Sequence, residues 1–441
     1  MTGSDDVGAG DDAMHSETVG SAGLRAPARI GLDGSLDAAV SGAAPGDLVT
    51  VTATLDTPEG IRWRSAADFV ADEAGAVSLR SATALAGSYE GVDANGLLWS
   101  LRPDDRPRAE ATKLGLEPLH VVLEATSKGR PLGEAEVVVE QVGPGVTQVP
   151  VREDGLFGEL FVPAGEGPFR PVLVLGGSEG DVNPRVAAFL ATHGYLALAL
   201  AYFASPGLPP ELVDIEIEYF ERALGFLRAR PEAAGPPAVV GRSRGGELSL
   251  LLGLYLGIDT VVAYVPSPIV HSGIKSTGET WLSDVPSWRY GGRPVPYLAH
   301  SDGKLYVEDG VILCTPTYLD CMDDWDAVEA AMLALEDSPS KVLLLSGARD
   351  MVWPSALYSE IALARLRRRR GGRQRHVMCA GAGHVFVPPV LPATLTIVRH
   401  EQVDERLDLG GAPRANAAAG ARANHEMLRA LAGDMDEEEW T

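Results

Sequence analysis

Residues 238–252 read Ala-Val-Val-Gly-Arg-Ser-Arg-Gly-Gly-Glu-Leu-Ser-Leu-Leu-Leu. The apolar start predicts a buried strand, which ends in Gly-x-Ser-x-Gly and passes at once into a helix-forming stretch. A nucleophile elbow requires this order of elements, with Ser243 at the turn. Gly241 and Gly245 suit the turn because strand and helix backbones pass close together there, and a Cβ would crowd them. A pattern this short also occurs by chance, so the surroundings must decide.

The surroundings of the elbow alternate strand with helix. Continuous apolar runs, as expected of strands buried on both faces of a parallel sheet, lie at 171–175, 195–201, 260–265 and 341–345. Helical patterns such as the amphipathic stretch 211–230 separate them. We therefore predict an α/β domain over 151–432, with a mostly parallel sheet covered by helices. Residues 267–322 interrupt the alternation with Gly, Pro and aromatic residues, which favours a lid-like insertion.

The chain before this domain has a different periodicity of apolar residues. Segments with alternating apolar residues lie at 48–54, 119–125 and 134–140 and are separated by turn sequences rich in Pro, Gly and Asp. This period-two pattern predicts antiparallel strands, and together they predict an all-β sandwich over 28–150. Low hydrophobicity with scattered Gly, Ser and Asp predicts a disordered acidic tail over 1–27. The acidic end, 433–441, is predicted to be a second tail.

Composition excludes several classes of partner and location. The chain has 441 residues, enough for two domains, and a formal net charge of −24, which opposes binding to nucleic acid or to an anionic membrane surface. Its three cysteines have neither metal-ligand spacing nor a disulfide framework, so we predict a reducing, cytoplasmic location. The polar, acidic start has no apolar core of a secretory signal, and no apolar run is long enough to predict insertion into a membrane.

An acid and a histidine follow the elbow in the order that an α/β-hydrolase needs. Asp350 lies just past the apolar run 341–345, and His384 lies just past the next predicted strand. A serine hydroxyl needs a base to take its proton, and the imidazole needs an acid to fix its tautomer. Taken singly, Asp350 suits a helix start and His384 an ordinary loop, but at successive strand ends they favour catalysis. His400 and His425 are weaker candidates for the base.

Backbone amides are the predicted donors of an oxyanion hole. One is the amide of Arg244, directly after the nucleophile, and the other belongs to Ser178 or Glu179 in the glycine-rich turn 176–180. The same turn also suits simple packing. It does not match the glycine spacing of a dinucleotide-binding motif.

A run of arginines stands out on this acidic chain. It could bind the phosphates of a nucleotide-bearing substrate such as coenzyme A, or it could be the solvated end of a helix whose dipole favours cations. The candidate substrate-binding residues are Arg367, Arg368, Arg369 and Arg370.

The chain also resembles the acyl-CoA thioesterase and bile-acid-CoA:amino acid N-acyltransferase family over about 28–432. The motifs that carry the resemblance in the first part are at 63–72, 87–93 and 96–100. Those in the second part are the elbow and 208–209, 218–223, 286–290, 350–355, 381–384 and 388–389.

This resemblance implies an immunoglobulin-like N-terminal domain followed by an α/β-hydrolase domain. It implies Ser243 as nucleophile, Asp350 as acid and His384 as base, in agreement with the assignment from the residues themselves. The amino-acid-conjugating branch of the family has cysteine as nucleophile, whereas this chain has serine, which favours hydrolysis over transfer.

We therefore predict a serine hydrolase that cleaves acyl thioesters through an acyl-enzyme. It should need no metal or redox cofactor, with coenzyme A or a carrier protein entering only as part of the substrate. The alternatives are an acyltransferase that passes the acyl group to an alcohol or amine, a carboxylesterase or peptidase, and a non-catalytic binding protein. The sequence predicts neither the acyl chain nor the oligomeric state.

Overall fold

The computed structural model describes residues 17–21, 23–180, 182–275, 284–300, 305–369, 371 and 373–436. The chain divides into two compact units. The N-terminal unit comprises Met1–Val142 together with Val387–Leu395, and the C-terminal unit comprises Gly143–Phe386 together with Thr396–Thr441.

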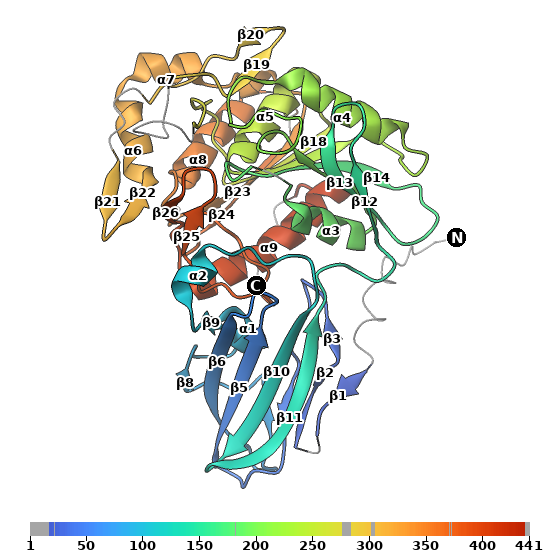
Figure 1. Cartoon of the computed structure of the whole chain (residues 1–441), viewed down its shortest axis with the longest axis vertical. Helices are drawn as coiled ribbons and strands as arrows, with labels where there is room; N and C mark the ends of the chain where they lie inside the picture. Colours follow the sequence, from blue (N-terminus) through green and yellow to red (C-terminus); the bar gives the residue numbers. More distant parts are fainter. Residues whose placement is uncertain are drawn as a thin grey trace. The chain divides into compact units, whose positions relative to one another are not determined.

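The described residues of the N-terminal unit form two sheets and two short helices, coloured blue to cyan in Figure 1. One sheet has the order β1-β2-β4-β7, with strands Thr18–Val19, Leu24–Pro27, Ala39–Val40 and Val77–Ser78. The other has the order β3-β11-β10-β5-β6-β8, with β9 paired to β6, and its strands are Arg29–Ile30, Arg130–Val139, Leu119–Ser127, Leu48–Asp56, Arg62–Val70, Ala86–Gly87 and Arg102–Pro103. The helices are α1 (Gly96–Trp99) and α2 (Arg106–Glu110).

Alternating burial produces this sheet structure. In β5 the side chains of Val49, Val51 and Ala53 are fully buried, while the residues between them are half-buried. Such alternation matches the two-residue period of a strand, so one face joins the core and the other stays more exposed. The predicted all-β N-terminal fold is confirmed.

The ends of this unit differ from expectation. Residues 17–27 are not all tail, because Leu24 and Ala26 are fully buried and their strand β2 pairs with β4; the prediction of disorder is wrong here, and residues 1–16 lie outside the described part. The division falls after Val142 rather than at residue 150. The reason is that β12 (Thr147–Val151) belongs to the C-terminal unit, where it pairs with the strand Phe157–Val162. A prediction of disorder from composition overlooks β2, because Leu24 and Ala26 are only two buried apolar residues among polar neighbours.

Val387–Leu395 also belongs to the N-terminal unit, although it lies far along the chain. The backbone amide of Ala393 donates to the Trp99 carbonyl at 2.9 Å, and the Thr394 hydroxyl donates to the Leu101 carbonyl at 2.5 Å. The segment therefore belongs to a unit whose other residues lie far earlier in the chain. Thr394 and Leu101 are 293 residues apart.

The C-terminal unit is organised around one long sheet (Figure 1). Its order is β12-β13-β15-β14-β17-β18-β23-β24, and every pairing from β15 to β24 is parallel. After β12 the strands in that order are Phe157–Val162, Tyr195–Ala201, Arg170–Leu175, Ala238–Arg242, Thr260–Tyr264, Lys341–Gly347 and Gln374–Cys379. The main helices are α3 (Pro184–Thr192), α4 (Ile217–Ala229), α5 (Arg244–Leu256), α8 (Ser355–Leu366) and α9 (Pro413–Ala432).

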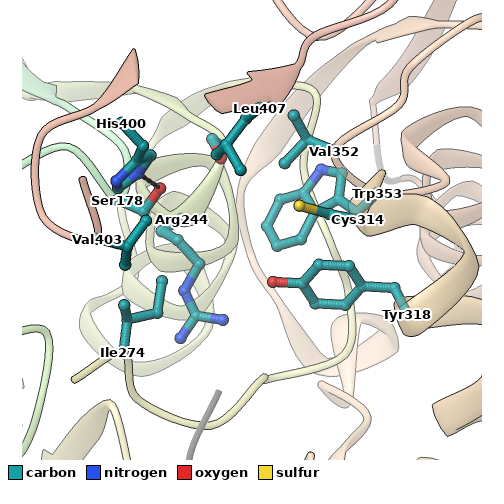
Figure 2. A pocket seen from close by; sticks show the side chains of 11 residues that line it. Ser178, Arg244, Ile274, Cys314, Tyr318, Val352, Trp353, His400, Val403 and Leu407 are labelled. Carbon is teal, nitrogen blue, oxygen red and sulfur yellow. Dashed lines mark hydrogen bonds between the residues drawn. The ribbon is translucent and has the colours of Figure 1, made fainter. Parts of the chain in front are cut away.

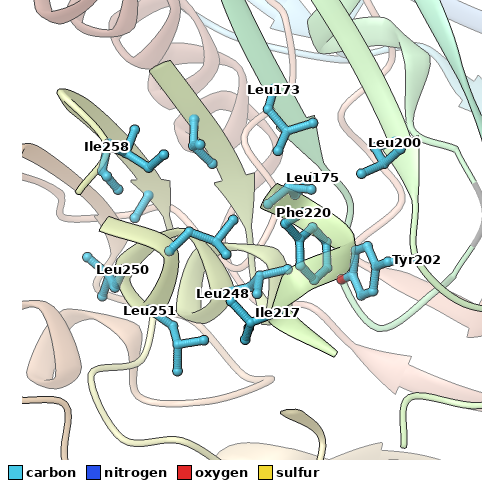
Figure 3. Packing of buried hydrophobic residues seen from close by; sticks show 14 of the residues in the cluster. Leu173, Leu175, Leu200, Tyr202, Ile217, Phe220, Leu248, Leu250, Leu251 and Ile258 are labelled. Carbon is cyan, nitrogen blue, oxygen red and sulfur yellow. The ribbon is translucent and has the colours of Figure 1, made fainter. Parts of the chain in front are cut away.

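Continuous apolar strands suit this sheet because helices cover it. Leu173, Leu175 and Leu200 of the strands gather with Phe220 of α4 and Leu248 of α5, all buried (Figure 3). Burying such side chains contributes roughly 1.5–3 kcal/mol each. The predicted α/β-hydrolase fold class is confirmed, and parallel strands with their carboxyl ends at one edge supply the place where site residues meet.

The predicted insertion contains more regular structure than expected. Between β18 and β23 the described residues form short strands and helices, namely β19 (Trp288–Tyr290), β20 (Arg293–Pro294), β21 (Tyr306–Glu308), β22 (Val311–Leu313), α6 (Cys314–Asp320), η1 (Cys321–Asp323), α7 (Trp325–Ala331) and η2 (Leu335–Asp337). β19 pairs with β16 (Ile215–Glu216), and β22 pairs with β26 (Glu405–Asp408), which pairs with β25 (Ile397–His400). Elements this short lack the periodicity that predicts secondary structure.

None of the helices among the described residues combines the length and the apolar character needed to cross a bilayer.

Candidate active site

Ser243 occupies the turn between β17 and α5. Its backbone has φ 58° and ψ −121°, a strained conformation for a residue with a side chain. A Cβ on Gly241 would lie 2.0 Å from the Gly245 carbonyl oxygen, and one on Gly245 would lie 2.1 Å from the Gly176 carbonyl oxygen. Both glycines therefore permit the close backbone approach that a sharp strand-to-helix turn needs.

Asp350 and His384 form a buried pair. Asp350 follows β23, His384 follows β24, and these strands are neighbours in the sheet. His384 Nδ1 lies 2.9 Å from Asp350 Oδ2 and 3.0 Å from Oδ1. Backbone amides of Val352 and Trp353 donate to the same carboxylate at 2.9 and 3.3 Å. The carboxylate is thus held in place and can keep the proton of the imidazole on Nδ1, which leaves Nε2 as the basic nitrogen.

The structure brings the acid and the base together, but it does not join Ser243 to His384 by a hydrogen bond within the described residues. The serine stands at the carboxyl end of β17, at the same sheet edge as the other two residues. Hydrogen bonds between catalytic groups are often long before substrate binds. The elbow serine and the Asp350–His384 pair are the components that nucleophilic catalysis needs, and they stand at one edge of the sheet.

The residues predicted to supply the oxyanion donors differ in what they contact near Ser243. The amide of Arg244 begins α5 directly after the serine. Gly177 lies against the nucleophile, because a Cβ there would be 3.1 Å from Ser243 Cβ. Ser178 lines the adjacent cavity, and its hydroxyl lies 2.9 Å from His400 Nε2. Glu179 pairs through its side chain with Arg242, and its backbone amide stays a predicted oxyanion donor.

Tyr202 is a contributor that the sequence analysis missed. Its hydroxyl donates to the carbonyls of Gly176 at 2.9 Å and Gly177 at 3.0 Å, and burial raises the pKa of this phenol. The bonds fix the glycine turn beside Ser243. The available signal was position, since Tyr202 directly follows β15 at the edge where the other site residues lie.

Ser243 is one of the residues that line a cavity. Figure 2 labels the ten others. The cavity holds about 360 Å³ of empty space, open solvent included. Its polar lining residues are Ser178, Ser243, Arg244, Tyr318 and His400. Its remaining lining is apolar, with Ile274, Cys314, Val352, Trp353, Val403 and Leu407. A mostly apolar lining with a few polar groups is typical of a small-molecule site.

The side chain of Arg244 is anchored in the interior. Its guanidinium pairs with Glu247 at 3.0 Å and donates to the carbonyl of His271 at 2.9 Å and to the hydroxyl of Ser287. Burial raises the pKa of Glu247, an effect that the Arg244 charge opposes, and the Trp288 indole donates to this carboxylate at 2.7 Å. The residue after the nucleophile is thereby held from both its backbone and its side chain.

The arginine run makes different contacts from those predicted for phosphate binding. Arg368 lies 3.7 Å from Glu336, and Arg369 donates to the Ser338 carbonyl at 2.9 Å. Arg367, Arg368 and Arg369 are exposed and none of them lines the cavity, while Arg370 lies outside the described residues. These contacts agree with the solvated helix end. Phosphate recognition by the run stays a prediction.

The weaker base candidates have other places. His400 lines the cavity as the partner of Ser178, and His425 belongs to α9. Within the described ranges, no three side chains of His, Cys, Asp or Glu are grouped as metal ligands.

Both parts of the chain match known family models. Residues 33–153 match the N-terminal region of acyl-CoA thioester hydrolase/BAAT, and residues 215–433 match the C-terminal region of BAAT/acyl-CoA thioester hydrolase.

Several curated proteins are similar over most of the chain. Acyl-coenzyme A thioesterase 6 of Homo sapiens is 31% identical over 395 residues, covering 88% of this chain and 90% of that protein. The peroxisomal succinyl-coenzyme A thioesterase of Mus musculus is 31% identical over 405 residues, covering 90% and 92%. Among solved structures, a dienelactone hydrolase from Klebsiella pneumoniae is 17% identical with a TM-score of 0.38, covering 65% of this chain and 98% of its own.

Proposed function

The chain belongs to the acyl-CoA thioester hydrolase/BAAT family, and on that premise we propose that it cleaves acyl thioesters through an acyl-enzyme on Ser243. One observation carries this proposal. Ser243 holds the strained elbow backbone at the same edge of the sheet as the hydrogen-bonded pair of His384 and Asp350. The membership itself makes the protein an acyl-CoA thioesterase-like hydrolase; the residues and steps below are our proposal.

The first half-reaction transfers the acyl group to the protein. Ser243 Oγ attacks the thioester carbonyl carbon while His384 Nε2 takes the hydroxyl proton, and Asp350 stabilises the resulting imidazolium. The amides of Arg244 and of the glycine turn at Gly177 or Ser178 donate to the oxyanion. The carbon–sulfur bond then breaks, and His384 returns the proton to the departing thiolate.

The second half-reaction releases the acid. Water attacks the acyl ester as His384 removes one of its protons, and the carbon–oxygen bond to Ser243 breaks as that proton returns to Oγ. Each step uses only the side chains and amides named here, and the chemistry requires no metal or redox cofactor.

Labelling and turnover together test the proposal. A fluorophosphonate probe should modify Ser243, found by peptide mass spectrometry, and should abolish thiol release from acyl-CoA. Hydrolysis that persists after full labelling, or labelling at another residue that removes activity, would contradict the assignment of Ser243.

Transfer to an acceptor is the second candidate, because the matched family model also carries the BAAT description. The serine nucleophile supports hydrolysis, since an oxygen ester is less activated than the thioester of a cysteine enzyme. Measuring free acid against acyl adduct with alcohols and amines present separates the two reactions.

We also propose that the reaction takes place in the cytoplasm. Within the described residues none of the three cysteines, Cys314, Cys321 and Cys379, forms a disulfide, which supports a reducing compartment. Similar proteins include ones named as mitochondrial and peroxisomal. Fractionation of the producing cells, with immunodetection of the protein, tests the location.

A further inference from the structure

Two residues that line the cavity beside Ser243 carry hydrogen-bond donors that the proposed steps do not use. The donors are the Nε–H of Arg244 and the hydroxyl of Tyr318. Arg244 reaches it from the first turn of α5, and Tyr318 reaches it from α6 in the insertion. Figure 2 shows the Arg244 side chain along one wall and the Tyr318 hydroxyl pointing toward it from the opposite wall.

Neither donor has an acceptor within the part of the chain that the structure describes. Arg244 is 2% exposed, and its Nε is buried without a hydrogen bond even though the other guanidinium nitrogens are bonded. Tyr318 is 4% exposed, and its contacts are ring contacts with His271, His300 and Trp353. Buried donors are normally satisfied in folded proteins, so a pair without acceptors in a binding cavity indicates an acceptor on the ligand.

The surrounding charges decide what kind of acceptor fits. The guanidinium of Arg244 already pairs with the carboxyl group of Glu247 at 3.0 Å, and Glu247 is fully buried. Burial also lowers the pKa of His300 to about 4 and lowers that of His271 well below its ordinary value, so both imidazoles are neutral near neutral pH. A carboxylate placed here would be an additional buried anion without its own partner, which is costly. A neutral oxygen has no such cost.

We propose that Arg244 Nε and the Tyr318 hydroxyl bind a neutral oxygen on the acyl chain, so that the site selects acyl thioesters bearing an oxo or hydroxyl group. This inference rests on the proposed hydrolysis at Ser243. It adds that the apolar walls receive the carbon chain while the two donors read its oxygen substituent. An unsubstituted chain would leave both donors buried and unpaired.

A panel of thioesters of equal chain length tests the selection. Butyryl-CoA, β-hydroxybutyryl-CoA, acetoacetyl-CoA and succinyl-CoA are compared by thiol release with the full-length protein. We expect the hydroxy and oxo substrates to have kcat/KM on the order of tenfold or more above butyryl-CoA, with succinyl-CoA no better than butyryl-CoA.

Tyr318→Phe then removes one donor. It should lower the preference for the oxygenated substrates, measured as their kcat/KM relative to that for butyryl-CoA in the same variant, by on the order of tenfold and mostly through KM. Tyr358→Phe is the matched control, because Tyr358 is fully buried in the same aromatic cluster but does not line the cavity. Its hydroxyl is also without a partner in the described structure, and its loss should leave the preference unchanged.

The outcomes separate this inference from the proposed function. Hydrolysis of butyryl-CoA as fast as of its oxygenated analogues overturns the inference and leaves the thioesterase proposal intact. An equal effect of Tyr318→Phe on all substrates overturns it as well, because the hydroxyl would then act on the part that they share. If fluorophosphonate labels Ser243 yet no thioester is cleaved, the proposed function itself fails. A preference for succinyl-CoA overturns the choice of a neutral oxygen.

Discussion

Among the described residues of the C-terminal unit, two serine–histidine–carboxylate arrays differ in an instructive way. In one, Ser346 Oγ lies 2.7 Å from His376 Nε2, and His376 Nδ1 lies 2.8 Å from Glu360 Oε1. In the other, His384 is bonded to Asp350, while Ser243 has no hydrogen bond to His384 within the described residues. By hydrogen-bond geometry alone, the array around Ser346 is the more complete.

Access and backbone geometry reverse that ranking. Ser346 lies within β23 and is fully buried, so no substrate can reach its hydroxyl. Ser243 stands on a strained turn beside a cavity, with an N-terminal helix amide and a glycine turn next to it. Hydrogen bonds position a side chain. A nucleophile also needs access to the substrate and donors that stabilise the oxyanion. The array around Ser346 links β23, β24 and α8 instead.

Removing each serine gives the largest expected contrast. Ser243→Ala should lower kcat/KM for acyl-CoA by on the order of 10⁴ or more, because the nucleophile is lost. Ser346→Ala should leave it within about twofold, because only a buried hydrogen bond is lost. Thiol release measures both, with circular dichroism as the check on folding. A large loss in Ser346→Ala with an intact fold would contradict the comparison.

Neutralising each carboxylate should give the next largest difference. Asp350→Asn should lower kcat on the order of 10³- to 10⁴-fold, because the imidazole would lose the acceptor that fixes its tautomer. Glu360→Gln serves as the control, since Glu360 bonds a histidine in the same manner but away from the cavity. Its steady-state kinetics should match those of the unmodified protein. Equal losses in the two variants would refute the assignment of Asp350.

The glycine turn provides a smaller test of what surrounds Ser243. A Cβ on Gly177 would lie 3.1 Å from Ser243 Cβ and 2.6 Å from Glu179 Oε2, so Gly177→Ala should displace the turn. We expect kcat to fall roughly 10- to 100-fold while the KM changes less. Gly225→Ala on α4 is the matched control, because a Cβ there meets nothing within 4 Å. Unchanged kcat in Gly177→Ala would show that this turn does not hold the reacting carbonyl.

The smallest expected effect is on folding stability at acidic pH, through His376 and Glu360. Burial lowers the pKa of His376, and the bond to Glu360 partly opposes this. The unfolded chain therefore takes up a proton near pH 6.5 that the folded protein resists, so stability should fall as the pH drops below that value. Glu360→Gln should make the fall steeper, since it removes the opposing carboxylate, whereas His376→Gln should remove this contribution. Urea unfolding at a series of pH values measures it, and a flatter profile for Glu360→Gln would contradict the account.

Much of the candidate active site could be predicted from the sequence because its residues follow recognisable elements. Ser243 lies in a short motif, and Asp350 and His384 come directly after apolar strands. Parallel strands place their ends at one edge, so sequence order translates into spatial position. The assignment of these residues to catalysis remains a prediction until the variants are measured.

The rest depends on contacts that no local pattern encodes. Tyr318 belongs to a short helix in the insertion, and its position opposite Arg244 arises only when that insertion folds. The bond between Ser346 and His376 depends on the register of β23 with β24, in which Leu344 is paired with His376. The Leu24 strand was hidden by its polar surroundings, since two buried residues are too few for a periodic signal.

The passage of Val387–Leu395 through the N-terminal unit has a consequence for modularity. The chain leaves the C-terminal unit shortly after His384 and re-enters it shortly before His400, and in between it bonds to the carbonyls of Trp99 and Leu101. A gene fragment that starts at residue 143 would still encode this segment but not its anchors. The C-terminal unit therefore cannot be exchanged as one continuous stretch of gene. Recombination near residue 143 would separate Val387–Leu395 from the residues to which it bonds.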